Sequence, residues 1–585
     1  MLKILKYLSK KEWTLVSVSL LFIVTQVFLD LKLPDFMSEI TMLVQMGGST
    51  ISEILSAGGK MLACALGSLA ASTAVAIFAA RVASNLGARL RECLFGKVQS
   101  FSMEEISGFS TASLITRSTN DITQVQMLMV MGLQAMIKAP ILAVWAILKI
   151  SGKSWQWTLS TGSAVGLLML VVGICIFLAY PKFKKLQILT DDLNRVTREN
   201  LTGLRVVRAY NAESYEERKF DVANTELTGA NLYANRVMAI LLPSIHSVMS
   251  GLTLAIYWVG AYLIQSAGLQ SKMLLFSDMV VYSAYAMQIV MAFMLLVIIF
   301  IMLPRASVAA KRILEVLDTK PTIVDGSVTV SPIGVKGEVE FRDVSFKYPD
   351  AEDYVIRNVS FKAQKGETVA FIGSTGCGKS TVVNLIPRFY DATEGEVLVD
   401  GVNVRDYTQY ALHNKIGYVP QTATLFGGTI KSNVAYGDNG GGAALPEDIV
   451  NAVYTAQASD FVEEMEGSYD GFVAQGGTNL SGGQKQRVSI ARAVCRRPEI
   501  FIFDDSFSAL DYKTDRKLRA ALKHECADAT KLIVAQRIGT IRDADKIVVL
   551  DDGGVVGIGT HDALMKDCEV YRQIAYSQLS KEELA

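Results

Sequence analysis

A glycine-rich segment that contains one lysine and one serine is the first place in this chain where residue types and spacing predict chemistry. Residues 373–380 read Gly-Ser-Thr-Gly-Cys-Gly-Lys-Ser, which fits the pattern G-x-x-x-x-G-K-[ST] of loops that bind nucleotide phosphates. The apolar stretch VAFI precedes this segment, and the stretch STVVNLI, which reads as a helix, follows it. This strand–loop–helix order is the context that phosphate binding requires.

The loop predicts a role for each kind of residue in it. Glycines let backbone N–H groups point inward at phosphate oxygens, and a helix N-terminus adds a favourable partial charge. Lys379 is expected to reach the β- and γ-phosphates, and Ser380 to hold Mg²⁺. The predicted nucleotide-binding residues of the loop are Gly373, Ser374, Thr375, Gly376, Cys377, Gly378, Lys379, Ser380 and Thr381.

A further candidate metal ligand follows the apolar stretch IFIF. Asp504 is expected at the end of a buried strand, where a carboxylate can orient the Mg²⁺ shell. The alternative is an ordinary strand followed by an acidic turn, which is a weaker interpretation in a chain that also has a phosphate loop.

The distribution of charge divides the chain into two parts. With only 19% charged residues and a mean hydropathy of +0.30, the chain is too apolar for an ordinary soluble protein. Charges are sparse in the first half apart from two clusters and dense after about Pro304, which predicts a membrane domain followed by a soluble one. The absence of net charge gives no sign of nucleic-acid binding. Seven scattered cysteines indicate neither a disulfide framework nor a zinc site.

Six apolar stretches predict membrane helices, which need about 20 mostly apolar residues each. They cover residues 14–34, 61–80, 139–148, 158–180, 237–264 and 273–303. The third stretch is short by itself and must extend back through Lys138. One such stretch alone would fit a buried helix of a soluble core, but six in half a chain argue against that. No cleavage site follows the basic N-terminus, so no removable signal is expected.

The positions of lysine and arginine orient the predicted bundle. Residues 33–59, between the first two spans, contain no Lys or Arg, whereas the segments between spans two and three and between spans four and five are rich in them. We therefore expect a multi-pass protein of the cell membrane with both termini in the cytosol. The two basic segments are long and read as helices, whose tips would contact the domain that supplies energy.

The pattern changes after residue 318. A polar linker (319–336) is followed by short β-rich runs such as VEFRDVSF and ETVAFIG, which alternate with helical stretches. This pattern is typical of an α/β domain with a largely parallel sheet. The predicted organisation is an all-α six-helix transmembrane domain with two long intracellular segments (1–318), the linker, and an α/β P-loop nucleotide-binding domain (337–582).

Further motifs give the chain a resemblance to the ABC transporters, specifically to exporter half-transporters with an N-terminal membrane domain. Leu480-Ser481-Gly482-Gly483-Gln484, followed by KQRVSIARA, matches the family signature. The stretches LITRSTND and ENLTGLRVVRAYNAE resemble the two intracellular segments of the exporter membrane domain. The resemblance extends over essentially the whole chain.

The resemblance implies roles for individual residues and an assembly. Tyr348 is similar to the aromatic residue that stacks on adenine, and Gln421 to the residue that links Mg²⁺ to the membrane domain. The loop Ser508-Ala-Leu-Asp511 resembles the one that touches the opposite subunit. The family further implies a helical subdomain, alternating access, and a domain-swapped dimer. Each of its two sites for ATP and Mg²⁺ lies between one phosphate loop and the other subunit's signature.

Two positions depart from the family pattern. The residue after Asp504 is normally a glutamate that polarises the attacking water, and here it is Asp505. The switch histidine is replaced by Gln536, whose amide can bond to a γ-phosphate oxygen but cannot carry a proton. A carboxylate misplaced by about 1 Å can cost on the order of 100-fold in rate. The histidines of the chain lie elsewhere, and we expect one of them, His561, at the surface.

These departures predict a site that holds ATP and seldom cleaves it, although harmless drift in a working ATPase is the alternative. The intact Ser481, Gly483 and Gln484 would complete the site of a second, homologous half-transporter, so a heterodimer is expected. The predicted function is export of small amphipathic or drug-like compounds across the lipid bilayer. A regulatory or gating subunit without coupled pumping is the other hypothesis, and import is disfavoured.

Overall fold

The computed structural model describes residues 2–45, 49–151, 154–330, 334, 336–349, 351–437 and 442–578. Contacts divide the chain into two compact units, Met1–Gln99 with Thr111–Thr319 and Ser100–Ser110 with Lys320–Ala585. Residues 100–110, which the sequence groups with the membrane domain, therefore make their contacts within the second unit.

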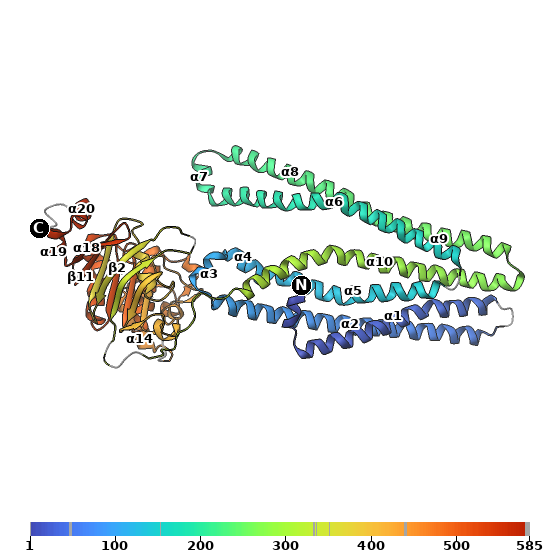
Figure 1. Cartoon of the computed structure of the whole chain (residues 1–585), viewed down its shortest axis with the longest axis horizontal. Coiled ribbons are helices and arrows are strands. Elements are labelled where there is room, and N and C mark those ends of the chain that lie inside the picture. The colour runs from blue at the N-terminus through green and yellow to red at the C-terminus, as the bar shows by residue number, and fades with distance from the viewer. Residues whose placement is uncertain are drawn as a thin grey trace. The chain divides into compact units, whose positions relative to one another are not determined.

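The described residues of the first unit form helices and no strands (Figure 1). They are η1 (Leu2–Tyr7), α1 (Lys10–Gln45), α2 (Ile51–Gln99), α4 (Thr111–Thr116), the π-helix η2 (Arg117–Asp121), α5 (Ile122–Ile150), α6 (Trp155–Thr202), α7 (Leu204–Ala209), α8 (Glu213–Ala239), α9 (Leu241–Ser266) and α10 (Leu269–Asp318).

Six helical segments among the described residues are long and apolar enough to cross a membrane, which confirms the number of predicted spans. The short third stretch, 139–148, is the second half of the 29-residue helix α5. Helix α10 continues from the sixth span through Pro304 to Asp318. The more polar residues 305–318 therefore form the end of a membrane helix that projects beyond the apolar region.

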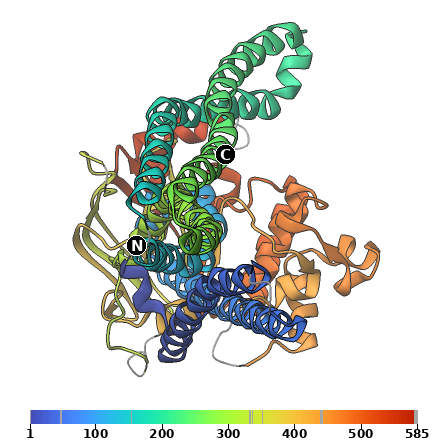
Figure 2. The ribbon, with the colours of Figure 1, turned by 90° about the vertical axis from the view of Figure 1, so that its right-hand side faces the viewer.

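Packing inside the first unit joins α1, α5, α6, α9, α10 and the end of α8 around one apolar cluster. The indole Nε1 of Trp157 on α6 donates to the carbonyl of Ile256 on α9 at 3.1 Å. Carboxylates on α1 pair with cations on α5: Asp30 lies 3.1 Å from Lys138, and Asp35 lies 2.8 Å from Lys149. Pairing lowers the cost of placing charges within an apolar bundle. The hairpin of α6 and α8, which ends in α7, lies apart from α1 and α2 (Figures 1 and 2).

The described residues of the second unit form three sheets. A six-stranded sheet has the order β12-β11-β3-β10-β9-β6, a four-stranded sheet has the order β2-β1-β4-β5, and β7 pairs with β8. The strands are β1 (Val339–Phe346), β2 (Ile356–Ala363), β3 (Thr368–Gly373), β4 (Glu394–Val399), β5 (Val402–Asn403), β6 (Ile416–Val419), β7 (Gly428–Thr429), β8 (Phe472–Val473), β9 (Ile500–Asp504), β10 (Thr530–Val534), β11 (Lys546–Asp551) and β12 (Gly554–Gly559).

The helices of the second unit complete an α/β arrangement. They are α3 (Met103–Gly108), α11 (Lys379–Leu385), α12 (Gln409–Asn414), α13 (Ile430–Val434), α14 (Pro446–Thr455), α15 (Ser459–Glu464), the 3-10 helices η3 (Ser468–Asp470) and η4 (Gln475–Gly477), α16 (Gly482–Cys495), α17 (Tyr512–Glu525), α18 (Ile538–Ile541), α19 (His561–Asp567) and α20 (Glu569–Gln578).

The pairing of strands confirms a parallel sheet only in part. In the six-stranded sheet, β3, β6, β9, β10 and β11 pair in parallel, whereas the pairs of the four-stranded sheet are antiparallel. Strand β9 is buried on both faces, because Phe501 and Phe503 enter one apolar cluster and Ile500 and Ile502 the other. Burial on both faces explains the continuous apolar run IFIF.

Helix α3 shows why residues 100–110 belong to the second unit. The carboxylate of Glu105 accepts a hydrogen bond from the backbone N–H of Thr322 at 2.8 Å, and it also closes a capping box with Ser102 at the start of α3. These bonds hold the pKa of Glu105 below its usual value despite burial. The bonds tie this short helix to the chain that leads into β1.

Candidate nucleotide site

The order of the six-stranded sheet gathers most of the predicted site at one edge. Strands β3, β10, β9 and β6 are neighbours and run in parallel, so their carboxyl ends meet at the same edge of the sheet. The phosphate loop follows β3, Gln536 follows β10, Asp504 ends β9, and Gln421 follows β6. Ligand sites of such sheets lie at the carboxyl ends of the strands.

The phosphate loop joins β3 to α11 through glycines in the left-handed region. Gly376 has φ 90° and Gly378 has φ 93°. A Cβ atom at Gly378 would lie 2.5 Å from Cγ2 of Ile356. Glycine is therefore required at this position both by its backbone angle and by the close approach of strand β2, which begins at Ile356. The neighbouring Cys377 is buried.

Lys379 points back into the loop rather than out to solvent. Its side chain is buried, and its Nζ donates to the carbonyls of Gly373 at 2.9 Å and Ser374 at 2.7 Å. Phosphate oxygens are stronger acceptors for an ammonium group than neutral carbonyls are. The geometry fits a lysine that reaches phosphate groups held by the loop.

Ser380 and Asp504, two of the three residues predicted to hold Mg²⁺, are in contact, and the third is Gln421. The hydroxyl of Ser380 donates to Oδ1 of Asp504 at 2.7 Å. Burial raises the pKa of the Asp504 carboxyl, and the neighbouring Asp505 raises this pKa further. Hydroxyl and carboxylate oxygens are the ligands that Mg²⁺ prefers, usually with several waters and phosphate oxygens completing its shell. The donor set therefore fits this ion.

Asp505 and Gln536 are in direct contact. Nε2 of Gln536 donates to Oδ2 of Asp505 at 2.8 Å, and Nε2 of Gln421 lies 3.5 Å from the same oxygen. Asp505 has a backbone φ of 46°, and its N–H donates to the carbonyl of Val534 at 3.0 Å. Burial raises the pKa of the Asp505 carboxyl. An amide donor therefore occupies the oxygen that a catalytic base would turn toward water.

Tyr348 lies beside the first turn of the helix that follows the phosphate loop. Its hydroxyl is 3.2 Å from Oγ1 of Thr381. Its ring packs edge-on against Phe346 and Tyr390, with ring centroids 5.0 and 5.3 Å away. These aromatic neighbours therefore fix the ring of Tyr348 next to the phosphate loop.

The signature residues stand apart from this edge. Ser481 caps the N-terminus of α16: its hydroxyl accepts from the N–H of Gln484, and the side chain of Gln484 accepts in return from the N–H of Ser481. Asp511 caps α17 by accepting from the N–H of Thr514 at 2.9 Å, which lowers the pKa of Asp511. Within the described part of the chain, no hydrogen bond joins Ser481, Gly483 or Gln484 to the phosphate loop.

One residue near the site was not anticipated from sequence. Gln578 is the last residue of α20. Its side chain forms hydrogen bonds with the backbone carbonyl of Gln536 and with the backbone N–H of Ile538. No motif marks this glutamine, and it is distant from the loop in sequence. Only the fold brings the two together.

Two family models match the chain, the ABC transporter transmembrane region over residues 16–311 and the ABC transporter model over residues 356–508. The chain belongs to the ABC transporters. This transporter is 39% identical, over 90% of its own length and 88% of the relative, to an uncharacterized ABC transporter ATP-binding protein of Mycobacterium tuberculosis (strain ATCC 25618 / H37Rv). It is 36% identical to an uncharacterized ABC transporter ATP-binding protein of Bacillus subtilis (strain 168), over 90% of both chains.

A further relative of this ABC transporter has a named activity. The ATP-dependent lipid A-core flippase of Pseudomonas fluorescens (strain Pf0-1) is 33% identical over 85% of this chain and 81% of the flippase. The structure of a bacterial Atm1-family ABC exporter with ATP bound superposes with a TM-score of 0.81 over 97% of this chain and 98% of that chain, at 24% identity. The transporter thus has the exporter fold. It is a multi-pass membrane subunit of an ATP-hydrolysing transporter and carries an ABC-type ATP-binding domain.

Proposed function

We propose that this chain is one half of a heterodimeric ABC exporter whose own ATP site binds nucleotide but seldom hydrolyses it. The observation that carries the proposal is the 2.8 Å hydrogen bond between Gln536 and Asp505, the two residues that depart from the family pattern. Aspartate is one methylene shorter than glutamate, and here its Oδ2 accepts a hydrogen bond from an amide, which acts as neither an acid nor a base. Both features oppose activation of a water molecule.

The intact signature supports a partner with a competent site. In the family's arrangement, the phosphate loop and Asp505 would serve one ATP, while Ser481, Gly483 and Gln484 would serve the other. A homodimer would contain two impaired sites. A heterodimer whose partner supplies glutamate and histidine would keep one working site, to which this chain contributes its signature.

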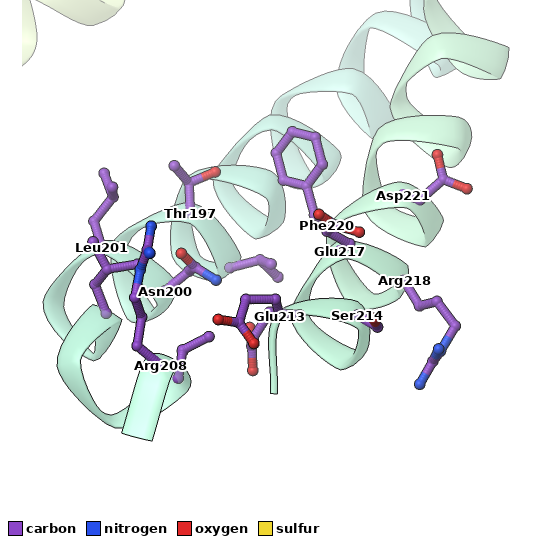
Figure 3. A pocket seen from close by; sticks show the side chains of 14 residues that line it. Thr197, Asn200, Leu201, Arg208, Glu213, Ser214, Glu217, Arg218, Phe220 and Asp221 are labelled. Atoms are coloured by element: carbon purple, nitrogen blue, oxygen red, sulfur yellow. The ribbon is translucent and has the colours of Figure 1, made fainter. Parts of the chain in front are cut away.

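The tip of the α6–α8 hairpin supports contact with a second half-transporter. Around α7 it exposes apolar side chains, with Leu204 43%, Val206 61% and Tyr210 79% exposed. Beside them lies a hollow of about 780 Å³, into which both hairpin helices contribute charged and apolar side chains (Figure 3). Its lining includes Asn200, Arg208, Glu213, Glu217 and Phe220. In a domain-swapped dimer, this tip would receive a segment of the partner's nucleotide-binding domain.

The substrate class we propose is small amphipathic or drug-like compounds that leave the cytosol across the cell membrane, with both termini of the chain in the cytosol. The similarity to a lipid A-core flippase supports amphipathic cargo, since that relative acts on a lipid. A gating subunit without pumping would share the ATP site. Transport into inside-out vesicles that requires ATP hydrolysis would exclude gating.

Replacement of Asp505 by alanine tests the function of this site. ATP turnover by the assembled transporter is expected to stay within about twofold of wild type, whereas loss of a working general base costs about 100-fold or more. Asp551→Ala, which removes an exposed aspartate at the end of β11 in the same sheet, is the matched control. A collapse of turnover in Asp505→Ala alone would show that Asp505 is a working base and that the asymmetric proposal is wrong.

We also propose that Ser380, Asp504 and Gln421 hold Mg²⁺ with the nucleotide, which predicts a pH dependence. A carboxylate must be deprotonated to bind a cation, and the pKa of Asp504 is raised above its usual value. Mg²⁺-dependent binding of an ATP analogue should therefore weaken on acidification at a higher pH than an unperturbed aspartate would cause. Mg²⁺ titrations between about pH 5 and pH 8 would measure this. Asp504→Asn should bind Mg²⁺ weakly at every pH, and equal Mg²⁺ affinity in the two proteins would contradict the assignment.

A further inference from the structure

We propose that Gln578, at the end of the C-terminal helix α20, is a positioning residue of the ATP site: it holds the loop that carries Gln536 in the geometry that reaches Asp505. The inference rests on the proposed function, in which Gln536 occupies the position that senses the γ-phosphate. It assigns to the C-terminal helix a part in setting nucleotide affinity.

The side-chain amide of Gln578 bonds to the loop at two points. Its Nε2 donates to the carbonyl of Gln536 at 2.7 Å, and its Oε1 accepts from the N–H of Ile538 at 2.8 Å. An amide suits this position because it carries a donor and an acceptor side by side. Helix α18 begins at Ile538, and its N-cap residue Arg537 provides no side-chain cap. Gln578 therefore supplies the acceptor that the first turn of α18 lacks.

Helix α20 is itself fixed to the core, so Gln578 is not a loose end. Tyr571 and Ala575 are fully buried, and at spacings of four and three residues they lie on the same face of α20 as Gln578. The hydroxyl of Tyr571 is 2.7 Å from Nδ1 of His561. His561 is only 5% exposed, which corrects the expectation that it lies at the surface. Burial lowers the pKa of His561, so a neutral imidazole is the form that meets Tyr571.

The two bonds act on the same residue that contacts the candidate base. Gln578 fixes the backbone of Gln536, and the side chain of Gln536 then donates to Asp505 at 2.8 Å. Hydrogen bonds of this length tolerate only small displacements. If Gln578 no longer holds the segment that carries Gln536, the side-chain amide of Gln536 should lose its fixed position beside Asp505. It should also lose its position beside any phosphate that the phosphate loop holds.

Hydrogen exchange on the full-length transporter tests the positioning role directly. Gln578→Met keeps the length and bulk of the side chain but neither donates nor accepts, and Gln578→Ala removes all of it. In both variants, the backbone amide hydrogens of residues 536–541 should exchange about tenfold faster than in wild type. An increase of this size corresponds to the loss of ordinary hydrogen bonds. Gln573→Met is the control, because among the residues that the structure describes the side chain of Gln573 bonds to Glu569 of its own helix alone, at 3.4 Å. It should leave exchange in 536–541 unchanged.

Nucleotide affinity provides the second measurement. Labelling of this chain by a photoreactive, non-hydrolysable ATP analogue should need about three- to tenfold more analogue in Gln578→Met than in wild type. Wild-type exchange and wild-type labelling in Gln578→Met would overturn the proposal, because packing alone would then explain the residue. Neither measurement depends on hydrolysis. If Asp505→Ala abolished turnover while Gln578→Met accelerated exchange, the proposed function would fail and the positioning role would stand.

Discussion

Replacing Ser481 by aspartate is expected to lower ATP turnover of the assembled transporter by about 100-fold or more, the cost of losing a preorganised donor at a transferring phosphoryl group. Ser481 is the second residue of the signature, and in the proposed heterodimer it faces the γ-phosphate in the partner's competent site. An aspartate there would place a negative charge against the phosphate. The measurement is steady-state ATP hydrolysis by the purified complex in lipid.

Aspartate is chosen because it separates catalysis from folding. Ser481 caps α16, and aspartate caps helices about as well as serine, whereas alanine would cost about 1 kcal/mol of stability. The thermal stability of Ser481→Asp should therefore match wild type. The comparison with Asp505→Ala is more informative than either variant alone. ATP turnover should depend on the signature of this chain, at Ser481, but not on its catalytic-base position, at Asp505. Turnover within about twofold of wild type in Ser481→Asp would contradict the proposal that this signature completes a working site.

Replacing Lys379 by methionine is expected to weaken ATP-analogue binding at this chain's own site by about 100-fold. The Lys379 ammonium lies inside the phosphate loop, where its Nζ donates to two backbone carbonyls at 2.7 and 2.9 Å. Bonds from a charged donor are worth about 1.5–3 kcal/mol each, and phosphate oxygens would replace those carbonyls as acceptors. Labelling of this chain by a photoreactive ATP analogue, scored separately from labelling of the partner, measures the loss.

The control for Lys379→Met is Lys365→Met. Lys365 is an exposed lysine whose ammonium lies 3.6 Å from Asp528, and exposed ion pairs contribute little to stability. The Lys365→Met variant should be labelled by the ATP analogue to the same extent as wild type. Equal labelling of Lys379→Met and wild type would mean that the loop does not hold the nucleotide phosphates.

These variants distinguish the parts of the proposal. Lys379→Met tests whether the site of this chain binds ATP, Asp505→Ala tests whether it hydrolyses ATP, and Ser481→Asp tests whether the chain serves a second site. Loss of turnover in Ser481→Asp with retention in Asp505→Ala requires two unequal sites. Loss in both would indicate two equivalent working sites, as in a homodimer.

Local pattern was sufficient to predict much of this transporter. The six membrane spans follow from the length of apolar stretches, because a bilayer sets that length for each helix separately. The strand β1 coincides with the run VEFRDVSF, and the buried strand that ends at Asp504 coincides with IFIFD, because burial on one or both faces leaves a pattern in the strand itself. The phosphate loop could also be predicted from the sequence, because its glycines and Lys379 lie within one short segment. The identities of Asp505 and Gln536 were visible as departures from the family pattern.

Contacts between distant segments were decided only by the tertiary structure. The bond from Gln536 to Asp505 exists because β10 and β9 are neighbours, with Val534 opposite Asp504, and nothing in either segment specifies that register. Three further features also depend on contacts between segments that are distant in sequence. They are the burial of His561, the contacts of residues 100–110 within the second unit, and the two hydrogen bonds of Gln578. Each depends on which elements pack together after the chain has folded. The sequence therefore determined which chemical groups this protein has and which local structures carry them, whereas the fold decided which of those groups meet.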